Sequence, residues 1–260
     1  MKVIYSLATV LLALTLCRAQ TTNDPKPTDD AYTQEVVRLL TALQKDGWSG
    51  WNTGTVVVRR YLGNDDPTVK TFAYVQPDLV FQILEANKRV AVTQVVKGKP
   101  YRQESPIKEQ AVVDPQPIWR EKVTAATLEV DGFSLACQLS EWPPLIVNDG
   151  PSAPPQKEWR LANHPTLILR SDYGRTTWEV ASVRVLKKIG ERQFSCVKTI
   201  HKTTIDVDGL MEVITTQYLS PDVPGHLVEE LKEFYKVKKK GKEPVPHMIT
   251  HQQVVELKLP

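Results

Sequence analysis

Two histidines, His247 and His251, have the spacing in this sequence that most resembles a metal site. On a helix, side chains four residues apart share one face, so two imidazoles could bind the same ion. Pro244 and Pro246 lie just before this stretch, however, and favour extended chain. On a strand, residues four apart lie about 13 Å from each other. We therefore expect no metal site here.

No other stretch carries a recognisable catalytic or cofactor motif. Asp206-Val-Asp208-Gly209 resembles the start of a calcium loop, but the later ligands are missing, so we predict a turn. The sequence contains no Gly-x-Ser-x-Gly, no His-Glu-x-x-His and no phosphate-binding glycine loop. The pair Glu229-Glu230 lies in a charged context that would not raise a carboxyl pKa. We predict a protein without cofactors that is not an enzyme; a hydrolase whose site is assembled from distant residues is the least favoured alternative.

A run of lysines is the strongest local charge in the sequence. It consists of Lys236, Lys238, Lys239, Lys240 and Lys242. Our first interpretation is a solvated hairpin tip that also discourages edge-to-edge pairing of sheets. The alternative is a contact for anionic lipid head groups or an acidic envelope polymer, worth about 1 kcal/mol per lysine.

The first residues have the composition of a secretory signal peptide. Lys2 is followed by an apolar run over residues 3–16 and by Cys17-Arg18-Ala19. The run is too short to span a bilayer. Leu16 is not the small residue that acylation of Cys17 would require, so we predict plain cleavage near Ala19. Residues 1–19 would be the signal peptide, residues 20–29 a flexible leader, and the mature protein periplasmic or secreted, without a transmembrane segment.

Charge and length limit what the mature chain can be. Without Lys2 and Arg18, 31 basic residues face 30 acidic ones. A chain so close to neutral is not typical of a nucleic-acid binder. About 240 remaining residues can bury a substantial core, so we predict one β-rich domain over residues 30–260.

Export would leave two cysteines, Cys137 and Cys196. In an oxidising compartment an even number of cysteines favours a disulfide, and closing a loop of this size would stabilise the fold by about 4 kcal/mol. We therefore expect Cys137 and Cys196 to be bridged. The alternative is two buried, reduced thiols on separate strands.

The spacing of apolar residues predicts one helix and many strands. Val36, Leu39, Leu40 and Leu43 recur at helical intervals, which predicts a helix over 31–45. Runs rich in Val, Ile, Thr and Tyr predict strands over 55–62, 69–75, 79–86, 89–96, 124–130, 133–139, 166–170, 176–189, 190–219 (a hairpin) and 248–257. The proline-rich segment 143–155 predicts a loop.

Residues 227–237 fit two patterns. Their apolar positions match a helix, and they also match a strand that returns into the last strand. We favour the strand, because the final apolar run needs an antiparallel partner nearby in the chain. The six tryptophans, at positions 48, 51, 119, 142, 159 and 178, suit the mouth of an apolar cavity or, more commonly, a filled core.

A family resemblance rests on residues 190–225. Gly190-x-x-x-Phe194-x-Cys196, a Thr-rich hairpin and then Tyr218 to Gly225 resemble the C-terminal part of secreted bacterial β-rich proteins. These are similar in layout to the lipoprotein-carrier group, whose open, strongly curved sheet is filled by a helix and holds acyl chains. The resemblance covers residues 54–259 in pattern only, and it identifies no ligand-binding residue in this chain.

Together these features predict a mainly β (α+β) fold. We expect a curved antiparallel sheet or open half-barrel of about nine to twelve strands with one N-terminal helix packed on it. The expected function is that of an exported, non-enzymatic cell-envelope protein that binds an apolar or lipid-bearing ligand between helix and sheet. The alternative is a structural or protein-interaction β module without a ligand cavity.

Overall fold

The computed structural model describes residues 29–62, 70–71, 78–97, 99–107, 121–143, 155–206, 210–237 and 245–260. These residues form one helix, α1 (Asp29–Leu43), followed by fourteen strands. The strands are β1 (Val56–Leu62), β2 (Lys70–Thr71), β3 (Leu79–Glu85), β4 (Arg89–Val96), β5 (Lys99–Pro106), β6 (Lys122–Val130), β7 (Phe133–Trp142), β8 (Gln156–Leu161), β9 (His164–Asp172), β10 (Thr176–Ile189), β11 (Arg192–Asp206), β12 (Leu210–Leu219), β13 (Leu227–Lys236) and β14 (Val245–Lys258). The predicted mainly β class is confirmed.

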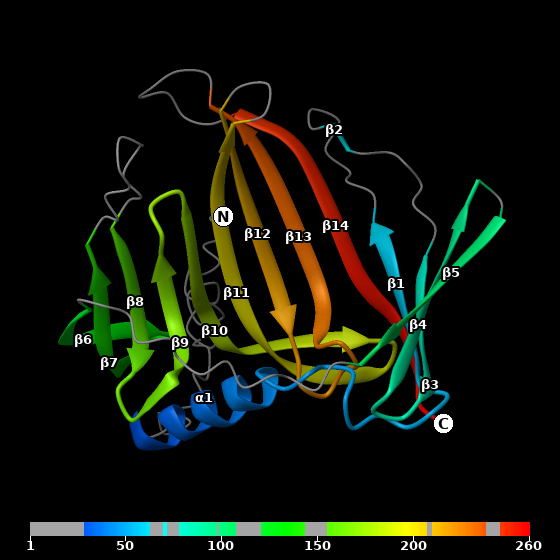
Figure 1. The fold of residues 1–260 in the computed structure, drawn as a ribbon, viewed down its shortest axis with the longest axis horizontal. Coiled ribbons are helices and arrows are strands. Elements are labelled where there is room, and N and C mark those ends of the chain that lie inside the picture. The colour runs from blue at the N-terminus through cyan, green and yellow to red at the C-terminus, as the bar shows by residue number, and fades with distance from the viewer. Residues whose placement is uncertain are drawn as a thin grey trace, which may run out of the picture.

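All the strands belong to one unclosed sheet (Figure 1). Its order is β5-β4-β3-β1-β14-β13-β12-β11-β10-β9-β8-β7-β6, with antiparallel neighbours, and the short β2 pairs in parallel with β14. The sheet has more strands than the nine to twelve that we predicted. The two strands that were not predicted, β5 and β8, have polar and charged sequences, KPYRQESP and QKEWRL, without the β-branched runs that reveal strands.

The ambiguous segment after Gly225 is a strand. Residues 227–236 form β13, which pairs with β12 on one side and β14 on the other. The favoured interpretation is confirmed and the helical one is wrong, because two neighbouring strands satisfy the backbone of β13.

Helix α1 packs one apolar face against the sheet. Tyr32, Val36, Leu39 and Leu40 follow helical spacing, and each is at most 8% exposed. Burying each of these side chains contributes about 1.5–3 kcal/mol. They join residues from β6 to β11 in a cluster, here called the α1 cluster: Tyr32, Val36, Leu39, Leu40, Val130, Leu135, Cys137, Leu161, Leu167, Leu169, Val180, Val183 and Val197.

A second core forms where the β10–β11 hairpin bends. Register shifts between Val180 and Ser182, and between Ser182 and Val185, bend β10 away from β9. The end of the hairpin then runs across the lower ends of β12 and β13 in Figure 1, toward β14 and β1. Apolar residues of the hairpin and of the segments that it crosses form the hairpin cluster: Val57, Ile189, Phe194, Cys196, Val223, Val228 and Val254.

The predicted signal peptide, 1–19, and nearly all of the predicted leader, 20–29, lie outside the described residues. In the part of the chain that the structure describes, no helix is long and apolar enough to cross a membrane.

Candidate functional site

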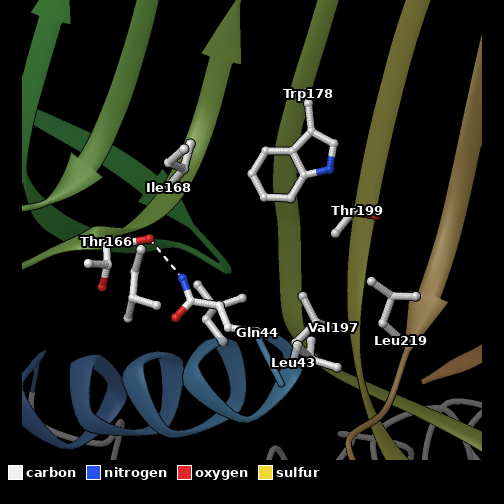
Figure 2. A pocket seen from close by; sticks show the side chains of 10 residues that line it. Leu43, Gln44, Thr166, Ile168, Trp178, Val197, Thr199 and Leu219 are labelled. Carbon is white, nitrogen blue, oxygen red and sulfur yellow. Dashed lines mark hydrogen bonds between the residues drawn. The ribbon is translucent and has the colours of Figure 1, made fainter. Parts of the chain in front are cut away.

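An apolar pocket of about 260 Å³ lies between α1 and the sheet. It forms where β9 and β10 diverge, because these two strands pair only from Thr177 to Glu179 of β10. Beyond that point the gap between them is bordered by the C-terminal end of α1 (Figure 2). Its lining residues are Leu40, Leu43, Gln44, Thr166, Leu167, Ile168, Trp178, Val197, Thr199 and Leu219.

The lining contains no charged side chain and few polar ones. Val197 is fully buried, and Leu167 and Thr199 are each 3% exposed, so these three residues form the deepest wall. Gln44 and Thr166 are exposed, and the Gln44 side-chain amide donates a hydrogen bond of 2.8 Å to the Thr166 carbonyl oxygen. The exposed pair thus marks a rim, and the pocket suits an uncharged, apolar group.

The N-terminal half of α1 is attached to the sheet by polar contacts. The Tyr32 hydroxyl donates to Asp131 Oδ2 at 2.8 Å, and the backbone N–H of Val183 donates to the same oxygen at 2.9 Å. Burial, together with the hydrogen bond to Asp131, raises the pKa of Tyr32 well above its usual value. The Arg184 guanidinium pairs with Glu35 at 2.8 Å. These contacts fix one end of the helix over β10.

The chain just after α1 is attached as well, to the turn between β12 and β13. The backbone N–H of Gly225 donates to the Gly47 carbonyl at 2.8 Å, and the His226 ring Nε2 lies 3.0 Å from the Lys45 carbonyl oxygen. The Trp48 ring stacks on Phe81 at a centroid distance of 5.1 Å. Contacts with the sheet therefore hold α1 on both sides of the pocket.

A second pocket, of about 240 Å³, is lined by Trp142, Gln156, Glu158 and Tyr173. Glu158 is 8% exposed; it accepts hydrogen bonds from Arg160 and from the Tyr173 hydroxyl. Burial, followed by the bond to Glu158, raises the pKa of Tyr173 to about 12. The Glu158 carboxylate is therefore already engaged by two donors.

One ionic cluster links the bent β10–β11 hairpin to strands β13 and β14. Glu229 accepts from His251 at 3.0 Å and pairs with Lys187 of β10 at 2.6 Å. The Lys187 ammonium lies 3.7 Å from the centroid of the Tyr218 ring. The hydrogen bond from His251, and then that from Lys187, lower the pKa of Glu229, while burial opposes them. The cluster thus attaches the end of β10 to β13 and β14.

The predicted disulfide between Cys137 and Cys196 is not formed in the structure, which has both as free, buried thiols. Cys137 lies on β7 in the α1 cluster and Cys196 on β11 in the hairpin cluster. The two thiols therefore belong to separate apolar clusters, on strands that are not neighbours in the sheet order. Burial raises the pKa of Cys196 to about 11, which disfavours its thiolate.

The structure describes some of the other residues that we predicted as candidate sites, but not all of them. His247 and His251 both lie in β14, as expected for extended chain. Among the described residues, no group of three or more His, Cys, Asp or Glu side chains could hold a metal ion. Lys236 is exposed at the end of β13, whereas Lys238, Lys239, Lys240 and Lys242 lie outside the described residues, as does the turn at 207–209.

The pocket residues were not predicted individually, apart from the general expectation that tryptophans suit a cavity mouth. Trp178 does line the pocket, as Figure 2 shows. Leu167, Val197 and Leu219 look like ordinary residues of a buried strand, and only the divergence of β9 from β10 exposes them to a cavity. No family model, curated protein or solved structure matches the chain.

Proposed function

We propose that this chain is an exported, non-enzymatic cell-envelope protein that holds an apolar or lipid-bearing ligand between α1 and the curved sheet. The observation that carries the proposal is the uncharged, apolar pocket of about 260 Å³ at that place. Sites for small ligands are typically concave, mostly apolar and largely preformed. The pocket has these properties, because α1 is fastened on both sides of it.

Two sequence features support the rest of the proposal. The composition of residues 1–19 supports export. The layout of one helix against an open, curved sheet supports the proposed resemblance to the lipoprotein-carrier group.

Quenching of tryptophan fluorescence by a bromine-labelled fatty acid tests the proposal directly. Trp178 lines the pocket, so a bromine atom bound there lies close to its indole ring. We expect saturable quenching that is mostly lost in Trp178→Phe. The matched control is Trp142→Phe, which removes a tryptophan from the other pocket and should leave the quenching unchanged.

Mass spectrometry provides the second readout. Protein purified gently from its natural envelope should carry a stoichiometric apolar molecule. Lipid-free protein that also shows no saturable quenching would contradict the proposal.

An interaction module is the second candidate function, favoured by one observation. The β4–β5 hairpin carries three exposed apolar side chains, Val95, Val96 and Tyr101, which are 46–55% exposed. However, β5 also carries Pro100, Pro106 and several charged residues, which discourage the addition of another strand. The pocket therefore supports ligand binding more strongly than this hairpin supports a partner.

A further inference from the structure

We propose that the pocket accepts a single linear chain of about ten carbon atoms and that Leu219 sets this limit. The inference rests on the proposed function and narrows it to one class of ligand: amphiphiles with one apolar tail and a head group that remains at the rim. Lipids with two or more chains would not be held.

The size of the pocket supports one short chain. A cavity of about 150 Å³ accepts a benzene ring. By proportion, the pocket of about 260 Å³ has room for about ten carbon atoms. It lies below the range of about 300–1,000 Å³ that is typical of sites for drug-sized ligands. Two acyl chains would need at least twice the space.

The lining places the head group outside. None of the ten lining side chains is charged, so a carboxylate or phosphate inside would lose its hydration without gaining a partner. The exposed Gln44 and Thr166 form a polar rim that can contact a head group. The tail therefore enters first, and the nature of the head group should matter little.

Leu219 faces the rim from the opposite side of the pocket. Figure 2 shows Thr166 and Ile168 of β9 on one side, and Leu219 of β12 on the other, beyond Val197 and Thr199. A tail that enters past Thr166 and runs over β10 and β11 meets the Leu219 side chain. Because Leu219 lines the pocket on the side away from Thr166, we expect the size of its side chain to fix the longest tail that fits.

A series of fatty acids from six to sixteen carbons, each used below its micelle concentration, tests the limit. We expect the dissociation constant to fall about fourfold with each added methylene until the chain reaches about ten carbons, and to stay constant beyond. One-chain decanoyl lysophosphatidylcholine should bind like decanoic acid, and didecanoyl phosphatidylcholine at least 100-fold more weakly.

Variants at position 219 test the residue itself. Leu219→Ala should move the plateau to a chain about two carbons longer, and Leu219→Trp to a shorter one. The matched controls are Leu210→Ala and Leu210→Trp, at an exposed position on the same strand, which should leave the plateau in place. Leu219→Val, a smaller change in volume, should move the plateau in the same direction as Leu219→Ala but by less, which keeps the test available if Leu219→Ala folds poorly.

The outcomes separate this inference from the proposed function. If no probe of any length binds the wild-type protein, the proposed function fails and the inference with it. Three other outcomes would overturn only the inference. These are an affinity that continues to rise up to sixteen carbons, a two-chain lipid that binds as well as a one-chain lipid, and a plateau that does not move in the Leu219 variants.

Discussion

At Gly225 the backbone and a neighbouring ring both require glycine. Its φ is +73°, in the left-handed region, and a Cβ atom built on it would lie 2.5 Å from the Trp48 ring. An alanine would therefore both strain the backbone and push against Trp48. We predict that Gly225→Ala lowers the free energy of unfolding by at least about 2 kcal/mol, measured by denaturant titration.

Gly190 provides the matched control for this prediction. Its φ is also positive, at +59°, but nothing lies within 4 Å of the position of a Cβ atom. Gly190→Ala should therefore cost only the backbone strain, about 1 kcal/mol. Equal losses in the two variants would show that the contact with Trp48 contributes nothing.

Individual residue contacts of this kind were beyond prediction from the sequence. The family resemblance includes Gly225, but the contact of Gly225 with Trp48 depends on how a distant segment packs there. Likewise, an even number of cysteines in an exported chain predicts a bridge between Cys137 and Cys196. In the structure the two cysteines lie in separate apolar clusters, and the number of cysteines does not predict that arrangement.

Among the elements, the bent β10–β11 hairpin depends on the carboxylate of Glu229. The pKa of Glu229 is lowered from its ordinary value of 4.5, first by the hydrogen bond from His251 and then by Lys187. A group with a lowered pKa stabilises the fold above its unfolded pKa, and the contribution disappears as the pH falls through the folded value.

We predict that Glu229→Gln destabilises the protein by roughly 2 kcal/mol at pH 7. The difference from wild type should shrink as the pH falls below about 4.5, because the wild-type carboxylate is then protonated as well. Denaturant titrations of both proteins between pH 3 and pH 8 measure this difference in the free energy of unfolding. Glu256→Gln, which removes an exposed ion pair with Lys258, should have little effect at any pH. A constant difference across the pH range would contradict the role of the Glu229 charge.

Element prediction succeeded where periodicity was strong. Helix α1 begins and ends within two residues of the predicted bounds, because its buried face has a clear helical spacing. Strands β5 and β8 were missed, because their backbones pair in the sheet although their side chains are largely polar. Whether such a segment forms a strand depends on a pairing partner elsewhere in the chain, which the local sequence does not show.

At the scale of the molecule, one unclosed sheet packs around two separate apolar clusters. The class of the fold follows from the many β-branched runs, but the bend in β10 arises from register shifts that no run of residues reveals. The pocket exists because of that bend, since β9 and β10 separate there. Its location between helix and sheet was expected from the resemblance, whereas its lining residues follow only from the register.

Hydrogen exchange with and without ligand distinguishes the two candidate functions across the whole molecule. A ligand that binds only the folded state at a hundred times its dissociation constant adds about 2.7 kcal/mol of stability. If decanoic acid binds in the pocket, we predict slower exchange in the last turn of α1 and in β9 to β12, where the lining residues lie. Strands β3 to β5 contribute no lining residue, so their exchange should change only as far as global unfolding controls it. Slower exchange confined to the β4–β5 hairpin would instead assign the contact to the exposed Val95, Val96 and Tyr101, and would favour the interaction module over the ligand pocket.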